Sequence, residues 1–187
     1  MANKVSFGLK NVHYAVVTET VGEDGKITSS YATPKAWNGA VSLELSQEGS
    51  SEDFYADDRA YYHLYANAGY TGSIETAGVP DDLLKEVFGM VEGSEKMIAE
   101  YSNVESKYIA LLFEIAGDKE ARKYCFYRVA MNRPQVAGET ITDSKTVKTV
   151  TCDIAASQRP DDYLVKVFAD SNATNYATWY ESVPVPA

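Results

Sequence analysis

Hydrophobic and polar residues alternate along much of this chain with a period of two, as in strands with one buried and one solvated face. The clearest example is residues 35–46, where three apolar side chains alternate with Ser42, Glu44 and Ser46. The pattern therefore predicts a mainly β protein. Strands are predicted at residues 11–20, 27–31, 35–46, 54–66, 73–76, 107–116, 122–131, 146–155, 163–168 and 176–183.

One stretch has the period of an α-helix instead. Pro80 suits the first helical position, the acids that follow it suit the positive end of the helix dipole, and Gly89 suits the C-terminal cap. We expect one α-helix at about residues Pro80 to Phe88. Because so short a helix is marginal on its own, we expect it to lie on the sheet.

The predicted strand at residues 107–116 is apolar on both faces, and it turns into the strand at 122–131. Such a strand is covered on both sides, so we expect the helix or another subunit to cover it. Neither an internal repeat nor a linker divides the chain. We expect a single domain over residues 1–187, with an extended C-terminal tail at about 182–187.

A polar, acidic stretch at residues 47–53 separates two of the predicted strands. We expect this stretch to be a loop, with the strands at 35–46 and 54–66 paired on either side of it as a long hairpin. Two glycines then predict a sharp turn at residues 67–72.

The chain is acidic, with 17 Lys and Arg against 27 Asp and Glu and a formal net charge of −10. An acidic surface repels nucleic acid, whereas proteins that grip the phosphate backbone rely on Lys and Arg. We see no signal peptide and no apolar run long enough to cross a bilayer, so we expect folding in the cytoplasm and no membrane partner.

Residues 55–58 have the form Tyr-x-Asp-Asp, which reverse transcriptases carry where they hold their catalytic metals. Two-metal catalysis needs carboxylates from separate segments, yet the only aspartate before Asp53 is Asp24, in a predicted turn. The context therefore excludes a polymerase. A solvated acidic segment is the simpler interpretation, and a single Mg²⁺ or Ca²⁺ site stays open as the alternative, with the ligands Glu52, Asp53, Asp57 and Asp58.

Candidate nucleophiles and bases are few. The two histidines, His13 and His63, lie in predicted strands, where a packed or surface imidazole is the simpler interpretation. Cys125 and Cys152 lie in apolar or alternating runs, which indicates buried thiols, and a disulfide between them stays open. With no Cys-x-x-Cys spacing and only two histidines, we expect no zinc site. The sequence also has neither a Gly-x-Ser-x-Gly elbow nor a phosphate-binding loop, and we expect no catalytic residue and no cofactor.

Several segments, taken in order, resemble the major tail proteins of phages with long, flexible, non-contractile tails, in particular the phi13-type family. The likeness extends over nearly the whole chain, and it depends on the order and spacing of the segments. At residues 55–58 the family usually has Tyr-Ala-Asp-Asn, and in this chain Asp58 takes the place of the final asparagine. The segments are FGLKNVHYA (7–15), WNGAVSLELSQEG (37–49), FYADDRAYY (54–62), NAGYTGSIE (67–75), PDDLLKEVFG (80–89), KYIALLFEIAGDKEARKYCFYRV (107–129) and RP (133–134).

The resemblance implies a tail-tube fold, a β-sandwich or partial barrel with a flanking helix. It also implies hexameric rings that stack into a tube in the virion tail, assembled in the host cytoplasm. DNA would pass through the tube transiently, and the partners would include the tape measure and tail terminator proteins.

The resemblance also implies that the loop between the early strands reaches between subunits or rings. The candidate contact residues are Gln47, Glu48, Glu52, Asp53, Tyr55, Asp57 and Asp58. The polar faces of the same predicted hairpin are candidates for the bore of the tube, and they comprise Ser42, Glu44, Ser46, Arg59, Tyr61 and His63. Two other hypotheses stay open: a β-sandwich binding or adhesion module, and a small hydrolase whose Ser or Cys nucleophile is oriented by His13 or His63.

Overall fold

The computed structural model describes residues 4–138, 140 and 147–186 of the chain. Within these residues the protein is mainly β, with one large antiparallel sheet, two small sheets and one short helix, and the strands do not close into a barrel. This agrees with the predicted fold class. The strands are β1 (Ser6–Val21), β2 (Ile27–Tyr31), β3 (Lys35–Ala36), β4 (Ala40–Glu48), β5 (Ser51–Ala56), β6 (Arg59–Tyr65), β7 (Gly69–Thr76), β8 (Val91–Glu92), β9 (Ile98–Ala99), β10 (Ile109–Gly117), β11 (Arg122–Met131), β12 (Val150–Ser157) and β13 (Lys166–Ala169).

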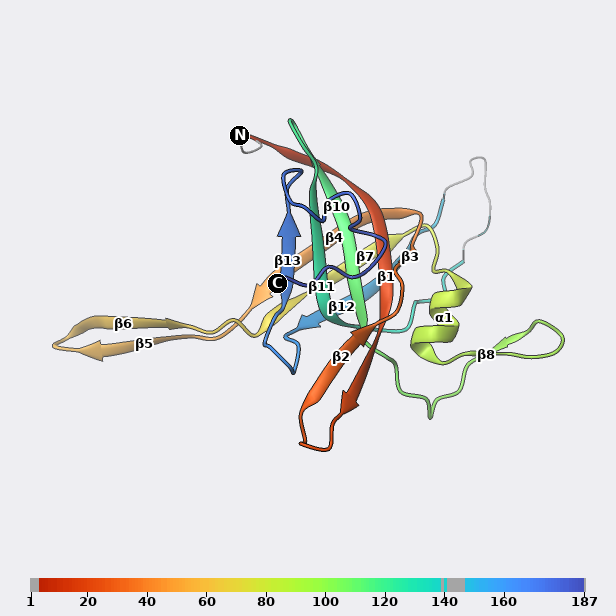
Figure 1. Cartoon of the computed structure of the whole chain (residues 1–187), viewed down its shortest axis with the longest axis horizontal. Coiled ribbons are helices and arrows are strands. Elements are labelled where there is room, and N and C mark those ends of the chain that lie inside the picture. Colours follow the sequence, from red (N-terminus) through yellow and green to blue (C-terminus); the bar gives the residue numbers. More distant parts are fainter. Residues whose placement is uncertain (1–3, 139, 141–146, 187) are drawn as a thin grey trace.

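The large sheet has the order β2-β1-β10-β11-β12-β7-β4, while β3 pairs with β1 and β13 pairs with β11. The sheet curves until β1 and β4 contact each other, although they do not pair. Figure 1 shows β5 and β6 projecting from one end of this body as a long hairpin, and α1 (Asp81–Phe88) lying at the other end.

The helix forms where the sequence predicts it. Its last residue is followed by Gly89 at φ 64°, a left-handed conformation that glycine adopts without a Cβ penalty, and Asp81 and Asp82 occupy the first turn. Leu83, Val87 and Phe88 are buried against the sheet. The prediction that the helix covers the sheet is confirmed.

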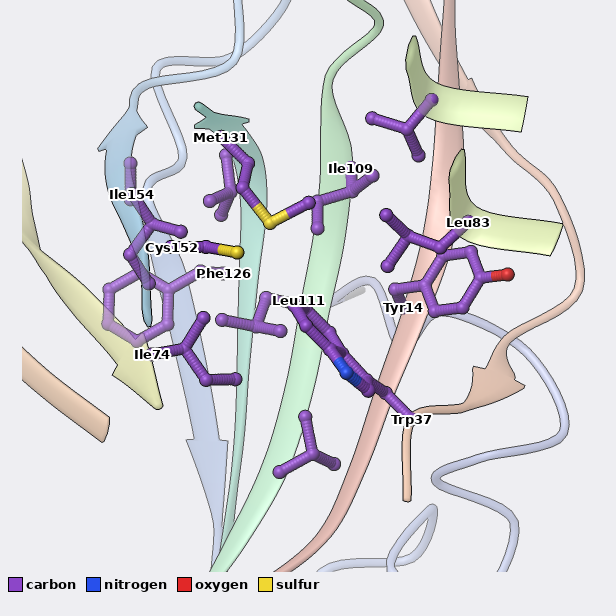
Figure 2. Close-up of a cluster of buried hydrophobic side chains, with 14 of the residues drawn as sticks. Tyr14, Trp37, Ile74, Leu83, Ile109, Leu111, Phe126, Met131, Cys152 and Ile154 are labelled. Carbon is purple, nitrogen blue, oxygen red and sulfur yellow. The ribbon is translucent and has the colours of Figure 1, made fainter. Parts of the chain in front are cut away.

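The main core lies inside the curved sheet. Side chains from β1, β7, β10, β11, β12 and α1 point toward one another there (Figure 2). The indole of Trp37 is buried among them, and its Nε1–H donates to the carbonyl of Gly78 at 3.1 Å. This bond satisfies the one polar atom of the indole ring and fixes the loop before α1.

A second apolar cluster covers the opposite face of β1, β10 and β11. Its inner layer includes Ala110 and Leu112, and Trp179 from the C-terminal segment is buried against them. The Tyr127 hydroxyl donates to the carbonyl of Pro184, and Lys123 Nζ donates to the carbonyl of Tyr176 at 2.8 Å. The C-terminal segment is thereby held on the sheet.

This second cluster corrects two expectations. Residues 176–183 form turns that cover the sheet, where a strand was predicted. Both faces of β10 are covered within the chain itself, one by the main core and one by the C-terminal segment. The two apolar faces of this strand therefore do not indicate another subunit.

The predicted strand at 35–46 is divided into β3 and β4 by a break at residues 37–39. The pairing of β4 with β7 shifts between Ala40 and Ser42, which leaves Val41 55% exposed although the alternation predicts burial. Two later strands are displaced from their predicted ranges, because β12 begins at Val150 and β13 covers only Lys166–Ala169. Residue 146, where one predicted strand begins, lies outside the described residues.

The early hairpin differs most from its prediction. β4 pairs with β7, and the segment between them forms the separate hairpin of β5 and β6 where a loop and a single strand were predicted. Residues 69–72 belong to β7 and make no turn. A Cβ on Gly72 would lie 1.8 Å from the carbonyl oxygen of Glu44, so this glycine permits the close approach of β4.

Candidate functional site

The hairpin of β5 and β6, residues 51–65, is called the arm below. Its strands form a two-stranded sheet of their own, and they join through a two-residue turn at Asp57 and Asp58. Both aspartates have positive φ, 53° and 55°, as a type I′ turn requires. The Tyr-x-Asp-Asp sequence is therefore the tip of a projecting hairpin.

The arm exposes six large apolar or aromatic side chains, which span 50% to 81% relative exposure. By register Phe54 lies opposite Tyr62, and Leu64 lies on the same face two residues further on. No residue of the arm belongs to either core cluster of the described chain. The six exposed side chains are Phe54, Tyr55, Tyr61, Tyr62, Leu64 and Tyr65.

The acidic residues of the arm are distributed along it. Asp53 lies opposite His63, with 2.5 Å between Asp53 Oδ1 and His63 Nδ1, whereas Glu52 lies on the other face opposite Leu64. Asp57 and Asp58 lie at the tip. The four carboxylates proposed as a Mg²⁺ or Ca²⁺ site are thus spread over both faces and the tip. Across the described residues, no group of three or more His, Cys, Asp or Glu side chains is placed to hold a metal ion.

The remaining two candidate contact residues lie at the root of the arm. Gln47 and Glu48 end β4, opposite Tyr70 and Gly69 of β7. The Thr71 hydroxyl donates to Glu48 Oε1 at 2.7 Å. These contacts anchor the root to the large sheet.

The outer face of the large sheet is polar over β4, β7 and β12. Register places its residues in three rows: Ser42, Glu75 and Thr151; Glu44, Ser73 and Asp153; Ser46, Thr71 and Ala155. We call these nine residues the polar face; they include three carboxylates and no Lys or Arg. The residues between them, such as Leu43 and Ile74, turn into the main core.

Several hydrogen bonds order this polar face and its border. Glu75 accepts from Ser42 at 3.1 Å and from Thr149 at 2.5 Å, and Asp153 accepts from the side chain of Asn132 at 2.9 Å. Two of its carboxylates are therefore held by neutral donors.

The predicted bore residues fall into two separate places. Ser42, Glu44 and Ser46 lie together on the polar face, whereas Arg59, Tyr61 and His63 belong to the arm. The prediction that both sets share one hairpin surface is wrong, because β4 pairs with β7 and not with β6.

The imidazoles and thiols occupy structural environments. His13 stacks on Tyr180 at 4.3 Å between ring centroids, and its Nδ1 lies 2.9 Å from the carbonyl oxygen of Asn11. Both cysteines are buried free thiols, and burial raises the pKa of Cys152 to about 11. The Cys152 thiol therefore stays protonated at neutral pH, whereas a cysteine nucleophile must be a thiolate.

A buried arginine lies in the segment between β12 and β13. Arg159 is 7% exposed, and its guanidinium binds both carboxylate oxygens of Asp161. The hydrogen bonds from Arg159 lower the pKa of Asp161 to about 2. The pair orders the segment between β12 and β13.

Sequence reasoning missed a groove between β1 and β4. It has a volume of about 500 Å³, and its walls include Leu9, Leu43, Leu45 and Tyr124. Lys166 of β13 also lines it, with Nζ 4.3 Å from the ring centre of Tyr70. The alternating pattern predicts which residues face inward, but it does not show that β1 and β4 approach each other without pairing and leave a groove between them.

No helix in the described part of the chain is long and apolar enough to cross a membrane. A scan against protein-family models finds no match to this sequence, and a search of curated proteins finds none either.

Proposed function

We propose that this chain is the subunit of a phage tail tube, in which hexameric rings stack into a conduit for DNA. The sequence resemblance to major tail proteins suggests the function, and the arm is the observation that carries it. In the virion, the tape measure and tail terminator proteins would be the partners of this subunit, and it would assemble in the cytoplasm of the host.

The arm supports the proposal because it has no packing partner among the other described residues of a single chain. A lone two-stranded hairpin is at best marginally stable in water, and three or more strands or a packing partner are needed to hold it. The arm nevertheless exposes six large side chains that belong to neither core. Contacts with another copy would bury these side chains and stabilise the hairpin.

The polar face supports the same proposal from a different part of the molecule. It is regular, extends across three strands, and carries carboxylates without basic side chains. Such a surface repels the DNA backbone, as the lining of a conduit for DNA must do to avoid binding it. We therefore assign the bore to this face, including Ser42, Glu44 and Ser46, and the arm to contacts between subunits.

Electron microscopy of the concentrated protein, alone and seeded with purified tail tips, tests the proposal. We expect hollow tubes of constant diameter with a regular axial repeat. A protein that stays monomeric under both conditions would contradict the proposal and favour a binding module. A hydrolase would show activity that depends on His13 or His63.

An arm-deleted variant gives the matched control. Ser50 and Ala66 flank the arm, and the amide of Ala66 donates to the carbonyl of Ser50 at 2.9 Å, so the cut ends already adjoin. Replacing residues 51–65 with an Asn-Gly turn therefore closes the gap without moving the sheet. We expect this variant to fold, because both cores are intact, and to form no tubes.

A further inference from the structure

The groove between β1 and β4 is bounded by two unpaired strand edges. β4 pairs with β7 along one edge only, and the start of β1 pairs with β10 along one edge only. In the described chain, no strand occupies the opposite edge of either segment, where residues 6–9 and 42–45 line the groove. Backbone groups on such edges are ready to pair with an added chain.

The walls of the groove combine polar groups with apolar side chains that are only partly covered. Leu9, Leu43, Leu45 and Tyr124 are half-buried, and Phe7 is 59% exposed at the rim. Glu44 contributes mainly backbone to the wall, because its register places its side chain on the polar face. The groove thus offers uncovered apolar surface that belongs to the edge of the main core.

Lys166 gives the groove a positive charge. Its Nζ lies over the rings of Tyr70 and Phe126, at 4.3 and 5.7 Å from their centres, and it forms no ion pair with any described residue. A cation held on aromatic rings and without a carboxylate partner favours an acidic ligand.

We propose that this groove receives the arm of a second copy of the chain. The inference rests on the proposed function and deepens it, since it names the surface that the arm contacts. One face of the arm supplies Phe54, Tyr62 and Leu64 for the apolar part of the walls, and the tip supplies Asp57 and Asp58 for Lys166. Apolar surface and charge therefore match in the same contact.

A contact between the arm of one copy and the groove of the next can repeat from subunit to subunit. The arm projects away from the sheet (Figure 1), while the groove lies between strands of the sheet, so one copy uses two different surfaces. A contact between different surfaces is heterologous, and it generates rings or open stacks in place of closed pairs. Each subunit would both give an arm and receive one.

Cross-linking between two variants, each with one added cysteine, tests the contact. One population carries Phe7→Cys at the rim of the groove and the other carries Tyr62→Cys on the arm, which are 59% and 58% exposed. The native cysteines are fully buried and will not compete. We expect a disulfide-linked dimer when the two populations are assembled together under oxidising conditions.

The control pairs Tyr62→Cys with Val21→Cys, which is 70% exposed at the far end of β1 and away from the groove. We expect no dimer from this pair. Equal cross-linking at Phe7 and Val21 would overturn the proposal. A cross-link that forms within a single Phe7→Cys/Tyr62→Cys chain would also overturn it, because the arm would then occupy its own groove.

Charge reversal tests the role of Lys166. We expect Lys166→Glu to raise the protein concentration needed for assembly about tenfold or more, and the double variant Lys166→Glu/Asp58→Lys to recover part of this loss. Lys26→Glu makes the same charge change on an exposed turn and should assemble normally. Denaturant unfolding of each variant before assembly checks that the monomer remains folded.

The outcomes of these experiments distinguish a failure of the groove proposal from a failure of the proposed tail-tube function. If the arm-deleted variant fails to assemble while Lys166→Glu assembles normally and Phe7→Cys gives no cross-link, the groove assignment is wrong and the tube remains. If the wild-type protein forms no tubes, both proposals fail. A small apolar molecule that fills the groove and co-purifies with the monomer would likewise overturn the docking of the arm.

Discussion

The turn at Asp57 and Asp58 uses residues that are not optimal for its geometry. Both have positive φ, where a side chain with a Cβ is strained and where Asn-Gly is the favoured pair. Aspartate tolerates this conformation better than most residues, but glycine would be more stable by about 1 kcal/mol. The chain thus retains two carboxylates at the tip at the expense of stability, which is consistent with a contact role.

The variant Asp57→Asn/Asp58→Gly separates charge from turn geometry. We expect the hairpin to be at least as well formed as in the wild-type protein, because both substitutions suit a type I′ turn. We also expect tube assembly to be impaired, because the acidic tip is lost. Nuclear magnetic resonance of the monomer reports the hairpin, and electron microscopy reports assembly. If this variant forms normal tubes, the hypothesis that Asp57 and Asp58 serve assembly is wrong.

The pair of Arg159 and Asp161 predicts a specific pH dependence of stability. The pKa of Asp161 in the folded protein, about 2, lies below its usual 3.8, so the unfolded chain binds the proton more readily. The stabilisation is therefore full above about pH 4 and is lost as the pH falls toward 2. We expect Asp161→Asn to lower the free energy of unfolding at pH 7 by on the order of 2 kcal/mol.

The same comparison at low pH supplies the control. At pH 2 the difference between wild type and Asp161→Asn should be much smaller than at pH 7, because the carboxyl is then about half protonated in the folded protein and almost fully protonated in the unfolded chain. Urea unfolding at several pH values measures it. A difference that does not change with pH would show that Asp161 acts through its shape and not through its charge.

At the scale of elements, Gly72 lets β4 lie close to β7. We expect Gly72→Ala to destabilise the protein by roughly 2 kcal/mol or more, because the added Cβ meets the Glu44 carbonyl oxygen at 1.8 Å. Gly78→Ala is the matched control, since nothing lies within 4 Å of its added Cβ, and its effect should stay within about 0.5 kcal/mol. Thermal and denaturant unfolding of both variants measure the difference.

The arm should change its dynamics on assembly. In the monomer its backbone hydrogen bonds join only two strands and lie outside both cores, so we expect fast amide hydrogen exchange over residues 51–65. In tubes we expect strong protection of the same amides, while β10 is protected in both states. Fast exchange of the arm in assembled tubes would contradict its burial between subunits.

The sequence predicts the regular elements well where one local signal dominates. The helix follows from Pro80, its amphipathic face and Gly89, and the hairpin of β10 and β11 follows from two apolar runs around a turn. The pattern around residues 47–66 is ambiguous, because a loop and an exposed hairpin share polar and aromatic residues. The aromatic alternation over residues 54–65 resembles a buried strand in sequence, whereas the structure places these residues in an exposed hairpin of β5 and β6.

At the scale of the candidate site, the sequence locates residues but not their neighbours. Ser42, Glu44 and Ser46 do share one polar face, as their spacing predicts, whereas Arg59, Tyr61 and His63 belong to the arm. Which strand lies beside β4 depends on contacts distant in the sequence, and local alternation carries no information about them. The groove and the two-sided cover of β10 depend on such contacts as well.

At the scale of the whole molecule, some apolar side chains are buried in cores within the chain and others remain exposed at its surface. Both faces of β10 are covered within the chain, so the body of the protein has a core that needs no partner. Six of the exposed large hydrophobic side chains gather on the arm and Phe7 lies at the rim of the groove, whereas the others are spread over the rest of the described chain. In the proposed tube, each subunit would fold first and associate later, through an arm that it gives and a groove that receives the arm of another copy.

An electron cryomicroscopy reconstruction of the assembled protein tests the central claim most directly. We predict a tube in which the arm of each subunit is buried against a neighbouring subunit and the polar face of β4, β7 and β12 lines the bore. A tube whose arms extend into solvent, or whose bore is lined by another face, would contradict this account. A protein that forms no assembly would contradict it entirely.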